Sequence, residues 1–268
     1  MSFQQRAPDP RLESFIAAYW RLDDLKTGQL YAATPKRHLE LVVNFGAPQL
    51  AGNAQLEQSH EYRVSWLTGL RDKPLFLKPT GQSVLYGVVF RDFALPDWTL
   101  NEAERSASWS TDLCGSPTST ALVEALAGSN TLEEAARKLD GFFLRSAWKG
   151  GWSSELGAAV SACEKAGQLS PSRIIASVGL HPASARALAQ SICGTSLRRY
   201  VRLVRFDRAL RLMSDEPRYR IADIAHEAGY YDEAHMAHDF AALTGTSPGR
   251  LRNARLKCSS LPHHLFTQ

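Results

Sequence analysis

The chain has 268 residues, of which 44% are hydrophobic and 22% are charged, and its net charge is +4. This composition is typical of a soluble globular protein, and the absence of a basic leader or a long apolar run argues against a signal peptide or a membrane span. The four cysteines are scattered without a CxxC pair, which favours a reduced chain in the cytoplasm.

Strand signals fill about the first 110 residues. Short β-branched and aromatic runs alternate with turn clusters, and the four clearest runs are HLELVVNFG, EYRVSWLTGL, KPLFLKPTG and QSVLYGVVF. Several such runs in succession predict an antiparallel barrel or sandwich of cupin-like type.

A β domain of this kind binds ligands in its interior, among apolar walls with a few polar groups. The candidate effector-binding residues are Trp20, His38, Glu40, Trp66 and Arg91. Other interpretations stay open, because the tryptophans also suit a core, Arg91 suits a turn, and His38 with Glu40 suits an exposed face. A domain without a pocket, serving dimerisation or contact with the DNA-reading domain, is a further alternative.

Helical periodicity begins after Pro96, where apolar residues recur every three or four positions. Thr131, with Glu134 three residues later, is typical of a capping box at a helix start. The segment KGGWSS, residues 149–154, has the composition of a linker. We therefore predict an α+β chain of two domains, a β-rich sensing and dimerisation domain with trailing helices at 1–149 and an all-α domain at 153–257.

The second domain contains an internal repeat. IIASVGL at 174–180 precedes IAHEAGY at 224–230 by fifty residues, and CGTSLRRY at 193–200 corresponds to TGTSPGRL at 244–251. Each unit has the pattern helix, tight turn, helix, with Gly179 and Gly229 suited to the positive φ of the turn. A long helix joins the units and could hold two recognition helices about 34 Å apart, the repeat of the major groove. A plain helical bundle is the simpler alternative.

Charge along this domain is uneven. Residues 151–268 carry 15 Lys and Arg against 10 Asp and Glu, yet no Lys or Arg lies between Arg220 and Arg250. Acids beside phosphates lower the affinity for DNA, so arginines flanking the units and helix N-termini must supply the contacts. The predicted DNA-binding residues are Ser184, Arg186, Thr195, Ser196, Arg199, Arg202, His235, His238, Thr246, Ser247 and Arg250.

The repeat resembles the DNA-binding domain of the AraC/XylS family of transcription regulators. The resemblance is carried by I-A-x-x-A-G-Y at 224–230, by S-P at 247–248 and, more weakly, by G-L-x-P at 179–182 with RYVRLVRFDRALRLM after it. It implies a tandem helix-turn-helix domain preceded by a β-rich sensing domain, with double-stranded DNA, a small-molecule effector and RNA polymerase as partners; a homodimer is left open.

The recognition helices depart from the family pattern, which usually places an Arg for base contacts in each unit. The first unit has Ala183, Arg186 and Ala187 there, and the second has Ala234, Ala237 and His238. We therefore expect Arg186 and His238 to contact bases, and His235 to pack or brace its helix.

The sequence thus predicts a DNA-binding transcription regulator responsive to an effector. The alternative is a ligand-sensing or protein-interaction module whose helix-turn-helix half has degenerated, which the acidic second unit favours. No GxSxG, HExxH, P-loop or GxGxxG motif occurs, so we expect no enzyme activity, no cofactor and no metal site.

Overall fold

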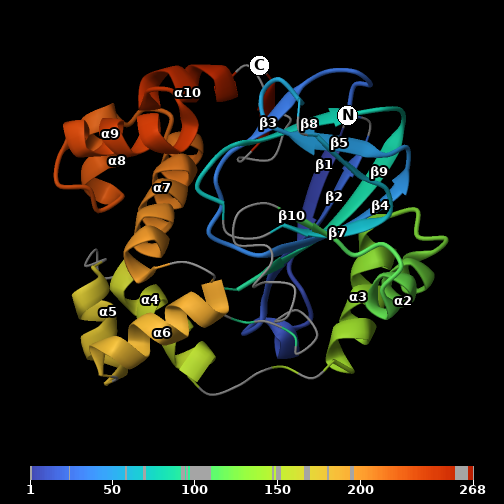
Figure 1. Cartoon of the computed structure of the whole chain (residues 1–268), viewed down its shortest axis with the longest axis horizontal. Helices are drawn as coiled ribbons and strands as arrows, with labels where there is room; N and C mark the ends of the chain where they lie inside the picture. The colour runs from blue at the N-terminus through green and yellow to red at the C-terminus, as the bar shows by residue number, and fades with distance from the viewer. Residues whose placement is uncertain are drawn as a thin grey trace.

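Two antiparallel sheets stack face to face in the computed structural model of the chain (Figure 1). The structure describes residues 2–23, 25–57, 59–68, 71–91, 94, 96, 110–146, 148, 152–165, 170–179, 181–193, 196–256 and 265–267. The first sheet has the order β1 (Ser2–Arg6), β2 (Ile16–Asp23), β9 (Ser83–Phe90), β4 (Glu40–Gly46), β7 (Ser65–Thr68), β10 (Ser110–Asp112). The second has the order β11 (Leu265–Thr267), β3 (Tyr31–Ala33), β8 (Leu75–Pro79), β5 (Gln49–Gly52), β6 (His60–Tyr62). The sandwich alternative of the prediction is confirmed, since the sheets do not close into a barrel.

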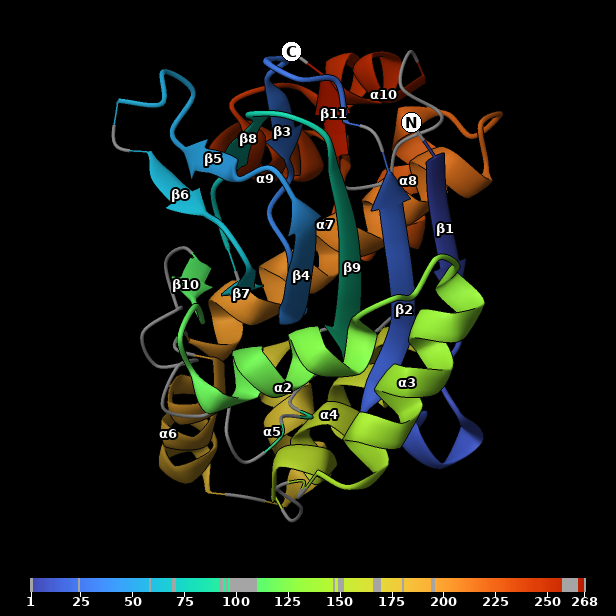
Figure 2. The same cartoon turned by 90° about the vertical axis from the view of Figure 1, so that its right-hand side faces the viewer.

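The central strands β2, β9 and β4 of the first sheet are buried on both faces, which explains why they are almost continuously apolar. Successive side chains point to opposite faces, so that Trp20 faces the interior between the sheets whereas Tyr19 faces outward. The outer face is covered by two helices, α2 (Pro117–Leu126) and α3 (Leu132–Leu144), which lie across it in Figure 2. A short 3-10 helix, η1 (Pro10–Leu12), also packs against α3.

The start of α3 has the capping geometry that the sequence predicts. The Thr131 hydroxyl accepts a hydrogen bond from the Glu134 amide at 3.2 Å, and the Glu134 carboxylate accepts one from the Asn130 amide at 2.9 Å. The two bonds satisfy amides that would otherwise lack partners at a helix N-terminus.

Seven helices form the second half of the chain over its described residues. They are α4 (Trp152–Lys165), α5 (Pro171–Val178), α6 (Pro182–Cys193), α7 (Leu197–Asp215), α8 (Ile221–Glu227), α9 (Glu233–Thr244) and α10 (Pro248–Leu256). The pairs α5–α6 and α8–α9 lie at opposite ends of α7 (Figure 1). With 19 residues at 1.5 Å each, α7 is about 28 Å long. Among the described residues, no helix has both the length and the apolarity needed to cross a membrane.

The two ends of α7 belong to different cores. Leu197, Tyr200, Val201 and Val204 join a cluster that extends through α4 and α5 to the outer face of the first sheet and its covering helices. From Leu203 onward, α7 contributes to a separate cluster with α8, α9 and α10. The first helix-turn-helix unit is therefore packed onto the β domain, whereas the second has a core of its own.

The chain also returns to the β domain after α10. Strand β11 pairs with β3 in antiparallel register, with Leu265 opposite Ala33 and Thr267 opposite Tyr31. It adds an edge strand to the second sheet, so the helical half is joined to the β domain on both sides.

Candidate DNA-binding surface and effector pocket

The first helix-turn-helix unit has the turn that the sequence predicts. Gly179 ends α5 with φ +70°, a left-handed conformation that only glycine adopts without strain. The second helix, α6, buries Ala185 and exposes Ser184 and Arg186. An Arg that is exposed on this helix is free to form a bidentate pair with guanine.

The second unit repeats this geometry. Gly229 has φ +84°, and the Asp232 carboxylate caps α9 by accepting a hydrogen bond from the His235 amide at 2.7 Å. The His235 ring packs edge-on against Tyr230, with centroids 5.3 Å apart, and its Nδ1 accepts a hydrogen bond from the Tyr231 amide at 3.4 Å. His235 therefore braces the turn, while His238 is exposed on α9.

A serine hydroxyl caps the N-terminus of the helix that follows each helix-turn-helix unit. Ser196 caps α7 by accepting from the Arg199 amide at 3.3 Å, and Ser247 accepts from the Arg250 amide at 3.4 Å. Each hydroxyl still has its own hydrogen to donate to a phosphate oxygen. Of the neighbouring predicted residues, Thr246 is half-buried, and Thr195 lies outside the described residues.

Two of the predicted phosphate-binding arginines are engaged within the protein. Arg202 is half-buried, and its Nε lies 2.8 Å from a carboxylate oxygen of Asp239 on α9. Arg199 forms an ion pair with Asp72 of the β domain. Arg250, in contrast, is exposed. Sequence reasoning could not foresee these pairs, because both join residues that are distant along the chain.

The acids of the second unit are also largely engaged. Asp239 is only 6% exposed and faces Arg202, Asp223 pairs with Arg220 at 3.1 Å, and Asp232 is the cap of α9. The repulsion that these carboxylates would exert on DNA is therefore smaller than their number in the sequence suggests.

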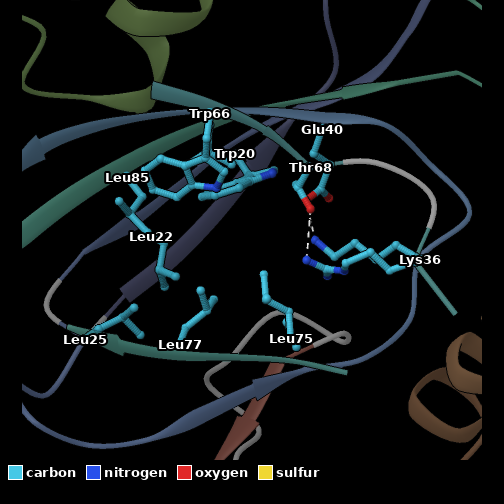
Figure 3. A pocket seen from close by; sticks show the side chains of 13 residues that line it. Trp20, Leu22, Leu25, Lys36, Glu40, Trp66, Thr68, Leu75, Leu77 and Leu85 are labelled. Carbon is cyan, nitrogen blue, oxygen red and sulfur yellow. Dashed lines mark hydrogen bonds and ion pairs between the residues drawn. The ribbon is translucent and has the colours of Figure 1, made fainter. Parts of the chain in front are cut away.

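A pocket opens between the two sheets (Figure 3). The space between its atoms, including the open mouth, is about 520 Å³. We call it the sandwich pocket, and it is lined by Trp20, Leu22, Leu25, Ala33, Lys36, Glu40, Val42, Trp66, Thr68, Arg71, Leu75, Leu77 and Leu85. Figure 3 shows that leucine and tryptophan side chains occupy one end, whereas Lys36, Glu40 and Thr68 lie at the other.

The polar end carries a net positive charge. Lys36 pairs with Glu40, and Arg71 donates from Nη1 to the Thr68 hydroxyl at 2.9 Å and from Nη2 to the Thr34 carbonyl at 3.4 Å. Burial lowers the pKa of Lys36 to about 8, an effect that Glu40 partly opposes, and burial lowers the pKa of Arg71 to about 10. Two cations thus face one carboxylate away from bulk water.

Two buried donors at this pocket have no acceptor among the described residues, namely Trp20 Nε1 and Arg71 Nε. A buried donor without a partner is costly, so both would gain from a ligand acceptor. Gly87 lies directly opposite Trp20 on β9, and any Cβ at this position would overlap the Trp20 indole. The glycine therefore allows the ring to lie flat at the pocket wall.

The structure brings together three of the five predicted effector residues, since Trp20, Glu40 and Trp66 line the sandwich pocket. His38 instead lines a neighbouring cavity between the β domain and α7, whose space including its open mouth is about 730 Å³, and Trp20 and Glu40 lie in the walls of both. Arg91 lines neither, because it lies at the end of β9 and donates from Nε to the Glu13 carbonyl at 2.8 Å.

Sequence reasoning missed Lys36, Thr68 and Arg71. Thr68 is the last residue of an apolar strand, whereas Lys36 and Arg71 lie in the segments between strands. Nothing in the sequence, however, shows that residues 36 and 71 lie opposite each other.

Comparisons with known proteins agree with this architecture. Residues 174–254 match a family described as a helix-turn-helix domain, and residues 4–104 match a domain of unknown function (DUF6597). No curated protein sequence matches the chain.

The fold is similar to solved structures of ToxT from Vibrio cholerae. One at 1.65 Å resolution has a TM-score of 0.52 at 11% identity, covering 94% of this chain and 98% of that one. ToxT bound to an unsaturated fatty acid has a TM-score of 0.50 at 12% identity, covering 94% and 95% of the two chains. ToxT bound to (E)-4-(8-methylnaphthalen-1-yl)but-3-enoic acid has a TM-score of 0.51 at 12% identity, covering 94% and 99%.

Two helix-turn-helix units joined by one continuous helix and preceded by a β sandwich with an internal pocket define a DNA-binding transcription regulator. With its match to a helix-turn-helix family and the I-A-x-x-A-G-Y motif of its second unit, the helical half of the chain is similar to the DNA-binding domain of the AraC/XylS family.

Proposed function

We propose that this regulator binds DNA under the control of a small carboxylic acid with an apolar body, held in the sandwich pocket. The observation that carries the proposal is the pairing of an apolar end with a buried, net-positive end, where Lys36 and Arg71 face the single carboxylate of Glu40.

The chemistry of the pocket fits a monoanion. Bound between Lys36 and Arg71, one carboxylate balances the net charge of the cluster and accepts from the otherwise unsatisfied Arg71 Nε. The apolar body of the acid would lie among Leu22, Leu75 and Leu77. Burial of that body supplies most of the affinity, and the charged end supplies orientation.

The similar solved structures support this class of effector. The ToxT ligands are an unsaturated fatty acid and an arylbutenoic acid, and both combine a carboxylate with an apolar body. The fold of this chain and the charge of its pocket are in accord with an effector of the same type.

The proposed DNA contacts follow from the exposed residues. Arg186 and His238 on the two recognition helices contact bases, with Ser184 and His235 beside them, while Ser196, Thr246, Ser247 and Arg250 contact phosphates near the helix N-termini that follow. Arg199 and Arg202 join them once their internal ion pairs open. Such a regulator works in the cytoplasm. RNA polymerase contact, a homodimer and the domain division at residues 149–153 stay predictions.

Fluorescence anisotropy with the full chain tests the DNA half of the proposal. We expect random duplex to bind with an affinity that falls steeply as salt rises, and selection from a random pool to return one preferred operator. No binding even at low salt would instead support the degenerate-module alternative.

Calorimetric titration with (E)-4-(8-methylnaphthalen-1-yl)but-3-enoic acid tests the effector half, with two variants of opposite charge effect. Lys36→Met should weaken binding because it removes a cation, and Glu40→Gln should strengthen it because it removes the competing anion. Equal affinities for both variants and the wild type would contradict a carboxylate site at this end.

A further inference from the structure

A single bridge between two chain segments closes the polar end of the sandwich pocket. Lys36 and Arg71 exchange two backbone hydrogen bonds, with N···O distances of 3.2 and 3.1 Å, as an isolated antiparallel bridge. Residues directly opposite in such a pair point to the same side, and their successors point to the other. Both bridge side chains enter the sandwich pocket, so the next residue of each segment faces outward.

Those next residues are Arg37 and Asp72, and both form ion pairs with the helical half. Arg37, whose side chain is 8% exposed, lies 2.7 Å from Glu164 on α4 and 3.4 Å from Asp207 on α7. Asp72 pairs with Arg199 in the first turn of α7. The bridge therefore has one face in the pocket and the other on the DNA-binding half.

The pair between Asp72 and Arg199 bears directly on DNA binding. A carboxylate occupies the same donors of a guanidinium that a phosphate would use. Arg199 cannot bind Asp72 and a DNA phosphate with the same donors. Asp72 thus competes with DNA.

We propose that the Lys36–Arg71 bridge couples the sandwich pocket to the DNA-binding half, and that Asp72 on its outer face inhibits DNA binding by occupying Arg199. This inference rests on the proposed function, because it takes the pocket as the effector site and Arg199 as a phosphate contact. Movement of the bridge on its pocket side changes how firmly Asp72 holds Arg199.

The expected size of the inhibition is modest. The Arg199 side chain is 44% exposed and that of Asp72 is 28% exposed, so the pair is partly screened by solvent. Pairs of this kind correspond to about a two- to fivefold change in an equilibrium constant.

A double-mutant cycle on the full chain measures the competition. Anisotropy at fixed salt gives the duplex affinities of the wild type, Asp72→Asn, Arg199→Ala and the double variant. We expect Asp72→Asn to raise the affinity about two- to fivefold when Arg199 is present and to have no effect in the Arg199→Ala background. Asp72→Ser serves as a second neutral variant, and circular dichroism confirms folding of each chain.

The pocket side of the bridge is tested by Thr68→Val, which keeps the shape of the side chain but removes the hydroxyl that accepts from Arg71. We expect the looser bridge to raise duplex affinity about twofold, and this gain to vanish in the Asp72→Asn background. A matched control is Thr80→Val, because the Thr80 hydroxyl donates to the Pro48 carbonyl on an exposed turn outside the pocket lining.

Three results would overturn the inference. They are an unchanged affinity for Asp72→Asn, an equal gain with and without Arg199, and an equal effect of Thr68→Val with and without Asp72. Each leaves the proposed function intact as long as the wild type binds duplex DNA in a salt-dependent way. If neither the wild type nor any variant binds duplex at low salt, the proposed function fails, and the inference fails with it.

Discussion

The two helix-turn-helix units share a plan but differ in what they pack against. Both place a left-handed glycine in the turn and a serine cap after the recognition helix. The first contributes Ile174 and the start of α7 to the core of the β domain, whereas the second closes a core around Phe206 and Phe240. Changes in the β domain can therefore reach the first unit by direct contact. They reach the second unit through α7.

The difference also extends to charge. The recognition helix of the first unit contains Arg186 and no acid, whereas that of the second contains Glu233 and Asp239 and no Arg or Lys. The second unit uses Asp239 to hold Arg202 of α7, which fixes its position on the connecting helix. We infer that the first unit supplies most of the base recognition and that the second mainly adds phosphate contacts and orientation.

The largest expected effect is on stability, and it tests whether the two cores unfold separately. Phe240 is fully buried and stacks edge-on against Phe206 at 4.8 Å, so Phe240→Ala should destabilise the second unit by about 3–5 kcal/mol. All six tryptophans lie at or before residue 152. We therefore expect denaturant unfolding followed by far-UV circular dichroism to shift, while the tryptophan fluorescence transition stays in place.

Tyr231→Ala is the control for that experiment, because this side chain is 92% exposed in the same unit. It should leave both transitions unchanged. If Phe240→Ala moves the two signals together, the cores unfold as one cooperative unit and the comparison breaks down.

The next effect concerns base recognition. On the selected operator, Arg186→Ala should cost about 1–3 kcal/mol of binding free energy, and His238→Ala should cost less, because only Arg can form a bidentate pair with guanine. Anisotropy on operator and random duplex separates the two contributions. Arg186→Lys keeps the charge and serves as the control: it should lose specificity while keeping affinity for random DNA. A larger loss for His238→Ala would reverse the ranking of the units.

The smallest expected effect is a pH dependence of effector affinity. Lys36 has a pKa of about 8 in the free protein, and a bound carboxylate raises it, so the complex keeps a proton that the free protein loses above pH 8. Affinity for the arylbutenoic acid should therefore be nearly flat below pH 7 and fall by up to about tenfold between pH 7 and pH 9. Calorimetry at several pH values measures it.

Lys36→Met should abolish this pH dependence. The first unit shares the core of the β domain and should be stabilised together with it when the acid binds. Because affinity is higher at pH 7 than at pH 9, the acid should raise the melting temperature reported by tryptophan fluorescence more at pH 7. A pH profile that is the same with and without Lys36 would mean that another group holds the carboxylate.

Much of the fold could be predicted because its signals are local. Gly179, Gly229 and the Thr131 cap each depend on a few neighbouring residues, and the helices from α6 to α10 lie between local start and stop signals. Among the strands that were missed, β1 and β3 are short or carry a mixed pattern that only pairing with a neighbour stabilises.

The candidate site was predicted less fully, because its essential contacts are not local. Trp20 was identified from residue type and Glu40 from residue type and strand position, but Lys36 and Arg71 become a pair only through the bridge between them. In the same way, the sequence shows Asp239 as a repulsive acid on a recognition helix, and only the packing of α9 on α7 turns it toward Arg202. A residue's charge can be read from the sequence, but the direction in which it points cannot.

The unbroken course of α7 has a consequence for promoter architecture. From Leu197 to Asp215 the helix contains neither glycine nor proline, so it has no residue at which it would bend easily. The angular phase between the two recognition helices is thereby set by the protein, whereas that of the half-sites is set by a DNA repeat of about 10.5 base pairs. Sites that have shifted by half a turn lie on opposite sides of the duplex, and a regulator of this build cannot bind both at once.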